Sequence, residues 1–133
     1  GPPVVIAQAA ADAVSFIGMP EGRIPLAEAT AYLALAPKSN RAYNAINQAI
    51  ADVKAGRAGV VPPHLRDAHY SGAEKLGHGK GYQYSHDAPR GVAAQEYLPE
   101  ELRGTRYYAP TDHGVERALG ERLTAIREML GRD

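Results

Sequence analysis

The sequence predicts an all-α domain, a helical bundle with a long irregular segment before its last helix. Three observations predict this fold class. Apolar residues recur every three or four positions near both ends of the chain, as they do on one buried helix face. Glycine and proline residues interrupt these stripes at short intervals, where loops are expected. The chain has 133 residues, of which 44% are hydrophobic, so we expect residues 1–133 to form a single domain with one core.

The first predicted helix covers about residues 4–17. Its apolar face has members at spacings of four, three and four: Ile6, Ala10, Ala13 and Ile17. Gly18, Pro20 and Gly22 follow and end the helix, because glycine and proline both disfavour its continuation.

The next two helices are predicted at about 25–36 and 40–55. Pro25 suits the first turn of one, because the amide hydrogen that proline lacks would have no partner there. Ser39 or Asn40 can cap the other by accepting a hydrogen bond from a first-turn amide. The apolar stripes of these two helices are Leu26, Ala29, Leu33 and Ala36, and then Tyr43, Ile46, Ile50 and Val53. Short loops join all three helices, which predicts an antiparallel helical stack.

The last helix is predicted at about 112–131, with Thr111 or Asp112 as its N-cap. Its apolar stripe is Leu119, Leu123, Ile126 and Leu130. The opposite face is charged, and two pairs stand four residues apart: Arg117 with Glu121, and Glu128 with Arg132.

Residues 57–110 contain four of the five histidines and six of the eight tyrosines, with little periodicity. A tyrosine ring is large and apolar with one polar tip, so we expect this segment to be an ordered arm that docks on a surface. The interface or arm candidates are Tyr43, Tyr70, Tyr82, Tyr84, Tyr97, Tyr107 and Tyr108. Short helical turns are predicted near 63–66 and 99–102, and a brief extended strand at 82–84.

Composition excludes several classes of protein. Fifteen basic and fifteen acidic side chains give a net charge of zero, which disfavours a module built mainly to bind phosphate backbones. The absence of cysteine excludes a disulfide scaffold, a thiolate nucleophile and a cysteine-based zinc site. The apolar stretches fall short of the roughly 20 residues that a membrane span needs. We therefore expect a soluble, cytoplasmic protein with no membrane partner.

No group of residues has a catalytic or metal-binding pattern. The run 77–81 combines glycines with Lys80, but the sequence lacks the preceding strand and the following helix of a phosphate-binding loop. The histidines of the arm are spaced by five, nine and eight residues, which matches no chelating pair on a helix. Ser85, His86 and Asp87 are consecutive, whereas the members of a catalytic triad come from separate elements. We predict no catalytic, cofactor-binding or metal-binding residue in this chain.

Several short runs of sequence are more specific than the periodicity. In chain order they are 18–26, 33–40, 61–68, 75–82, 95–99 and 107–112. Together they resemble the C-terminal domain of replication-associated recombination protein A, a family that includes the MgsA-type and Werner-helicase-interacting AAA+ ATPases. The residues that match the family's motifs include Lys38, Ser39, Asn40, His64, Leu65, Arg66, Gly77, His78 and Gly79.

The resemblance implies a helical domain related to the oligomerisation collars of clamp-loader-type ATPases. It implies assembly as a homotetramer, in a protein that acts at stalled or damaged replication forks. Family members carry an ATPase module upstream, so we expect this chain to be a C-terminal fragment of a DNA-dependent ATPase. ATP and Mg²⁺ are then expected only in that module. Two positions depart from the family pattern: Ser85 stands where a proline is expected, and the turn 88–91 lacks an aromatic residue.

The residues and the resemblance both favour a non-catalytic self-association module. The rival hypothesis is a binding module for single-stranded DNA, or for a replication partner such as single-strand-binding protein. It would use tyrosines as stacking platforms beside Lys75, Lys80 and Arg90. A third hypothesis is an independent hydrolase that acts through His78 or His86.

Overall fold

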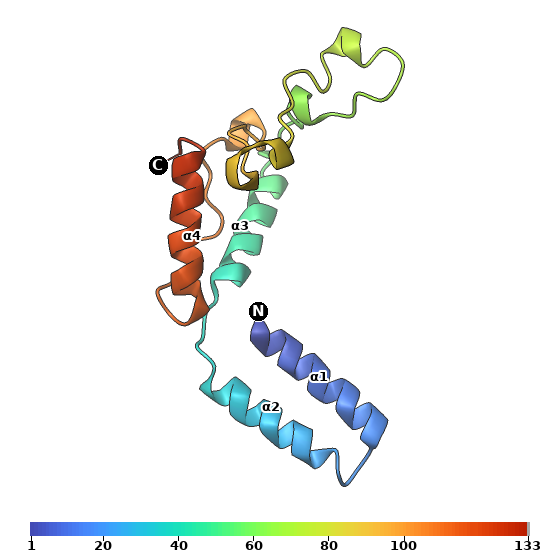
Figure 1. Cartoon of the computed structure of the whole chain (residues 1–133), viewed down its shortest axis with the longest axis vertical. Coiled ribbons are helices and arrows are strands. Elements are labelled where there is room, and N and C mark those ends of the chain that lie inside the picture. The colour runs from blue at the N-terminus through green and yellow to red at the C-terminus, as the bar shows by residue number, and fades with distance from the viewer. Residues whose placement is uncertain (133) are drawn as a thin grey trace. The chain divides into compact units, whose positions relative to one another are not determined.

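The computed structural model describes residues 1–132, and every regular element in that range is helical (Figure 1). The four α-helices are α1 (Pro2–Ile17), α2 (Arg23–Leu35), α3 (Arg41–Lys54) and α4 (Val115–Met129). Between α3 and α4 lie five 3₁₀ turns: η1 (Pro63–Leu65), η2 (Glu74–Leu76), η3 (Ser85–Asp87), η4 (Pro89–Gly91) and η5 (Glu100–Leu102). The all-α prediction is confirmed. None of the described helices is long and apolar enough to cross a membrane.

The chain divides into two compact units, with the boundary between Lys38 and Ser39. The first unit is a hairpin of α1 and α2, which pack against each other (Figure 1). Ala10 and Ala29, one from each helix, are its buried apolar residues. Alanine has no side chain beyond Cβ, so the two helix backbones can approach closely at these positions. Gly18, with φ of 77°, ends α1 as predicted, and the Gly18 amide still donates to the Val14 carbonyl.

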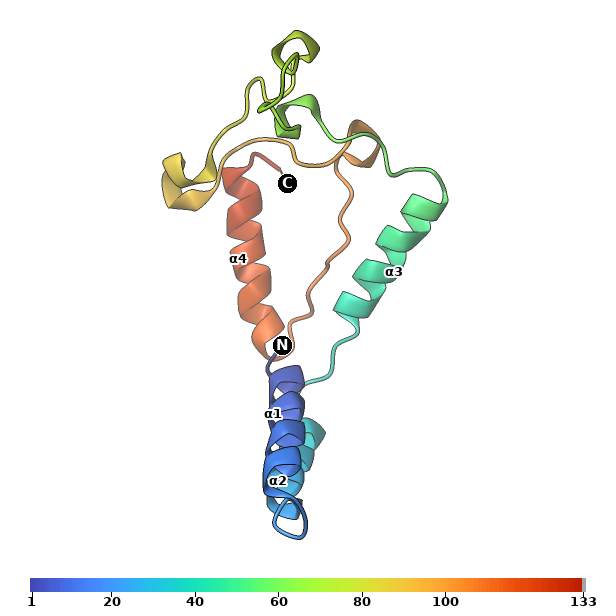
Figure 2. The same cartoon turned by 90° about the vertical axis from the view of Figure 1, so that its right-hand side faces the viewer.

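The second unit runs from Ser39 onward and contains α3, the arm and α4. In this unit α3 and α4 do not pack directly against each other. The arm's last segment, residues 103–111, runs between them (Figure 2). The buried apolar residues of this unit are Ala73, Ala93 and Leu102. Because α3 belongs to this unit, the predicted stack of three helices does not form one unit.

The predicted helix boundaries are close to the observed ones, except at the start of α4. Gly114, and neither Thr111 nor Asp112, is the residue before the helix, so the predicted N-cap is wrong. The Thr111 hydroxyl donates to the Glu116 carboxylate at 2.6 Å and accepts from the His113 amide at 3.2 Å, and His113 lies before the first helical residue. At the start of α3 the residue before the helix is Asn40, whose side chain makes no capping bond, whereas the Ser39 Oγ accepts from the first-turn amide of Arg41 at 3.2 Å, as predicted for one of the two candidates.

The turns predicted near 63–66 and 99–102 are confirmed by η1 and η5. The predicted strand at 82–84 is wrong. The Tyr82 amide donates to the Gly79 carbonyl and closes a turn. The buried side-chain amide of Gln95 then occupies both backbone groups of Gln83: its Oε1 accepts from the Gln83 amide at 3.0 Å, and its Nε2 donates to the Gln83 carbonyl at 2.7 Å. A side chain thus supplies the hydrogen bonds that a neighbouring strand would have made.

Candidate functional site

Tyr107 and Tyr108 fasten the arm to the two long helices of the second unit. The Tyr107 hydroxyl donates to Asp52 Oδ2 on α3 at 2.7 Å. The Tyr108 hydroxyl donates to Glu116 Oε1 on α4 at 3.0 Å. Hydrogen bonding to the carboxylate of Asp52 raises the pKa of Tyr107, whereas partial burial, followed by the bond to Glu116, raises that of Tyr108. The hydroxyl groups of these two interface candidates therefore form hydrogen bonds within their own chain.

Glu116 is a hydrogen-bonding centre that the sequence analysis missed. Its carboxylate accepts from the Thr111 hydroxyl and amide, from the Ser39 hydroxyl at 2.9 Å, and from Tyr108. These bonds, those of Thr111 above all, favour the charged form and lower the pKa of Glu116 from 4.5 to about 2. The start of α4 is thus tied to the start of α3 through Ser39, one of the motif residues.

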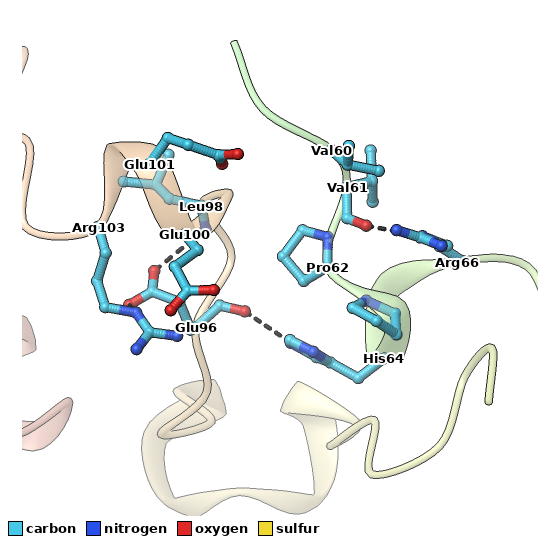
Figure 3. Close-up of a pocket in the computed structure, with 11 residues that line it drawn as sticks. Val60, Val61, Pro62, His64, Arg66, Glu96, Leu98, Glu100, Glu101 and Arg103 are labelled. Carbon is cyan, nitrogen blue, oxygen red and sulfur yellow. Dashed lines mark hydrogen bonds and ion pairs between the residues drawn. The ribbon is translucent and has the colours of Figure 1, made fainter. Parts of the chain in front are cut away.

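The other motif residues hold the arm and the ends of helices in place. Lys38 Nζ donates to the carbonyls of Leu33 and Ala36 and so closes α2. In the arm, His64 Nε2 lies 2.6 Å from the Glu96 carbonyl, and Arg66 Nε donates to the Val61 carbonyl at 2.7 Å (Figure 3). Asn40 is the residue before α3 without a side-chain cap, and Leu65 is half-buried in η1.

The loop around residues 77–79, which holds three of the motif residues, forms a small hydrogen-bond network. Arg66 Nη1 lies 3.2 Å from His78 Nε2, and His78 Nδ1 lies 2.5 Å from the Tyr70 hydroxyl. A guanidinium can only donate, so Nε2 of His78 is the acceptor and Nδ1 carries the hydrogen. The Gly79 amide donates to the Pro63 carbonyl at 2.9 Å. Residues 77–81 are not followed by a helix, so the run has no helix N-terminus to offer a phosphate.

The remaining tyrosine candidates keep much of their rings exposed. The exposed residues of this kind are Tyr43, Tyr70, Tyr82, Tyr84 and Tyr97. The Tyr97 hydroxyl bonds to Ser85 and Gln95, and the bond to Ser85 is the main cause of its lowered pKa. Tyr84 lies beside His86, with ring centroids 4.9 Å apart. These rings are available for contacts with another molecule.

The three cations proposed for nucleic-acid contact are all exposed but lie on different short turns. Lys75 is in η2, Lys80 is in the turn that follows, and Arg90 is in η4, where its φ is 58°. Figures 1 and 2 show η4 in a different part of the arm from the loop that holds both lysines. The structure therefore does not bring the three cations together as one patch.

One helix of the second unit, α3, has an exposed apolar face. Its members, which we call the α3 stripe, are exposed by 68%, 56%, 43% and 58%: Tyr43, Ile46, Ile50 and Val53. The half-buried positions of α3 lie on another face: Arg41, Ala45, Ala49 and Asp52. The face of α3 with two alanines and two charged residues is thus the more buried one, and the face with the large apolar side chains is exposed.

Two of the cavities in the second unit share Glu96, Leu98 and Arg103 in their linings. One has a volume of about 330 Å³ and is lined by charged groups of both signs, including Arg66, Arg103 and Glu101 (Figure 3). The other has a volume of about 470 Å³ and lies between α4 and residues 96–106. Within residues 1–132 there is no group of three histidine, aspartate or glutamate side chains placed to hold a metal ion.

The comparison with known protein families decides what the chain is related to. The model of a family described as MgsA AAA+ ATPase C terminal matches residues 3–127. The chain belongs to the MgsA AAA+ ATPase C-terminal family. The resemblance of the short sequence runs is thereby confirmed.

Relatives of this MgsA C-terminal domain are longer proteins. An uncharacterised AAA domain-containing protein of Mycobacterium tuberculosis is 54% identical over 125 residues, which are 94% of this chain and 28% of that protein. Replication-associated recombination protein A of Bacillus subtilis is 51% identical over 98 residues, 74% of this chain and 23% of that protein. The protein of the same name from Escherichia coli strain K12 is 42% identical over 124 residues, 92% of this chain and 28% of that protein. The chain therefore spans about a quarter of the length of these relatives.

Proposed function

We propose that this chain is a non-catalytic self-association module. It assembles AAA+ ATPase subunits as a homotetramer in a protein of replication-associated recombination, acting at stalled or damaged forks. The names of the Bacillus and Escherichia relatives support the process, and the family match supports the attachment to an AAA+ ATPase. ATP and Mg²⁺ belong to the ATPase module of such a protein. A role at replication forks would place the protein in the cytoplasm, at the nucleoid in a bacterium.

The exposed α3 stripe is the observation that carries the proposal. An amphipathic helix normally turns its large apolar side chains toward a core, because burying each one fully contributes about 1.5–3 kcal/mol. In α3 the four residues of the stripe remain between 43% and 68% exposed. A contiguous exposed apolar face of this kind marks an interaction surface. A second copy of the chain carries the same α3 stripe, and a two-fold symmetric contact between the two stripes would bury both of them.

A tetramer of dihedral symmetry needs two different self-complementary surfaces, because one such surface yields only a dimer. The first unit supplies candidates for the second surface. Phe16 of α1 and Leu35 of α2 are 92% and 86% exposed, and Met19 in the turn between them is 67% exposed. Four of the five buried apolar residues in residues 1–132 are alanines, so most of the large apolar side chains keep exposed surface that a contact could bury.

The test is the absolute mass of the chain by light scattering after size exclusion, over a dilution series at low and at high salt. The expected result is a mass about four times 14.2 kDa that persists at high salt, because apolar burial does not weaken as salt rises. A monomer at every concentration contradicts self-association by this chain. A tetramer that dissociates at high salt contradicts an apolar interface and points to ion pairs instead.

The alternative function, binding of single-stranded DNA or single-strand-binding protein through Lys75, Lys80 and Arg90, stays a prediction. It requires an affinity for oligonucleotide or protein that falls steeply with salt and a smaller slope for Lys80→Ala and Arg90→Ala. The separation of the three cations on different turns does not favour it over self-association.

A further inference from the structure

The cavity between α4 and residues 96–106, which we call the arginine cavity, has an unusual lining. Its volume of about 470 Å³ is within the range of sites that take small ligands or peptide side chains. Among the residues that the structure describes, four arginines line it, Arg103, Arg106, Arg127 and Arg132, against one carboxylate, that of Glu96. All of these residues belong to the second unit, so the cavity is complete within one compact part of the chain.

Glu96 offsets only part of this positive charge. Arg132 Nη2 donates to the Gln95 carbonyl at 2.6 Å and lies 3.5 Å from Glu96 Oε2. Arg103 Nε lies 3.9 Å from the same oxygen (Figure 3). Arg106 and Arg127 have no carboxylate within 4.0 Å among the residues that the structure describes. In the described lining, four guanidinium groups against one carboxylate give an excess of three positive charges.

The rest of the lining is aliphatic. The apolar side chains are Leu98 from the arm and Leu123, Ile126 and Leu130 from α4. All four side chains are only half-buried, so their exposed apolar surface can pack against a side chain that enters the cavity. No aromatic residue belongs to the described lining. Single-stranded nucleic acids bind largely by stacking bases on aromatic rings, so this lining does not suit them.

We propose that the arginine cavity binds a short acidic peptide segment of a partner protein. The carboxylates of the peptide bond to Arg106 and Arg127, and one large apolar side chain of the peptide packs on Leu123, Ile126 and Leu130. Guanidinium groups match carboxylates in shape as well as in charge, because they can donate two parallel hydrogen bonds. This site is separate from the α3 stripe, so the proposal goes beyond self-association.

The proposal is tested with the full chain and a panel of fluorescent ten-residue peptides, measured by anisotropy. Each peptide carries four Asp or Glu residues and one Leu, Ile or Phe at a varied position. The matched peptides replace the acids with Asn and Gln, or the apolar residue with Ser. We expect at least one acidic peptide to bind, and both matched peptides to bind much more weakly. Arg106→Gln and Arg127→Gln should each lower the affinity about tenfold, the usual effect of losing a charge-assisted hydrogen bond.

Arg122→Gln is the matched control, because Arg122 is an exposed arginine of α4 that does not line the cavity. It should leave peptide binding unchanged. Binding by none of the acidic peptides overturns the proposal, as does equal loss in Arg122→Gln and Arg127→Gln. Equal affinity for the serine-substituted peptide also overturns it, because the aliphatic lining would then have no role. So does an oligothymidine that competes fully with the peptide, since the cavity would then be a nucleic-acid site.

The same variants separate this proposal from self-association. Arg106→Gln and Arg127→Gln should keep the native mass of the parent chain in light scattering, because neither residue belongs to the α3 stripe. If the parent is a monomer and still binds the peptide as described, self-association fails and the peptide site stands. If the parent is a tetramer and binds no peptide, the reverse holds.

Discussion

Replacing Ile46 and Ile50 together by serine should dissociate the assembly without unfolding α3. The two side chains are 56% and 43% exposed, so the area still open on them equals about one whole isoleucine side chain. Its burial contributes about 2 kcal/mol, within the range for a full aliphatic side chain. In a two-fold contact both subunits lose this contribution, so the loss is about 4 kcal/mol, or roughly a thousandfold in dissociation constant.

The assay is sedimentation equilibrium or light scattering over a dilution series, with circular dichroism to follow helix content. Serine and isoleucine have similar helix propensities, so the helix itself should persist. The matched control is Asn44→Ser with Gln48→Ser, two exposed polar positions on other faces of α3. The reasoning is refuted if Ile46→Ser/Ile50→Ser has the parent's mass at every concentration, or if the control dissociates equally.

Three further predictions concern the stability of the second unit. The pKa of Glu116 is about 2 in the folded chain and 4.5 for a free side chain. The charged carboxylate therefore stabilises the folded state fully above pH 4.5, and this stabilisation is lost as the pH falls toward 2. Urea unfolding of Glu116→Gln should thus depend less on pH in this window, and curves parallel to the parent's would contradict this. Gln95→Ala should lower the free energy of unfolding by about 1–3 kcal/mol, because it removes the hydrogen-bond partners of the Gln83 backbone. Gln83→Ala leaves those backbone bonds in place and should hardly change the free energy of unfolding. Gly79→Ala should lower the melting temperature, because φ at this position is 72° and the new Cβ would lie 2.7 Å from the Cβ of Ala68. Adding Ala68→Gly to Gly79→Ala should restore part of the loss. An unchanged melting temperature in Gly79→Ala would show that the loop relaxes freely.

Local sequence signals were enough to find the helices. The apolar spacing, together with Gly18 and Pro37 as stop signals, put three of the four α-helices within about two residues of their observed ends. The start of α4 was misplaced because the Thr111 hydroxyl donates to a carboxylate within the helix and accepts from the His113 amide, which lies before the helix, so it caps no first-turn amide. The Glu116 carboxylate also accepts hydrogen bonds from Ser39, which is distant in the sequence, and from Tyr108 in the arm. Local spacing contains no signal for these bonds.

The sequence by itself determined the helical class, the approximate positions of the α-helices and the family, because each depends on local spacing or on ordered runs of residues. Only the tertiary structure decided which face of α3 is turned inward. The spacing of Tyr43, Ile46, Ile50 and Val53 predicts an apolar stripe but cannot say whether this chain or another molecule covers it. The arginine cavity likewise gathers side chains from positions 96 to 132, and their convergence depends on long-range packing that no local pattern contains.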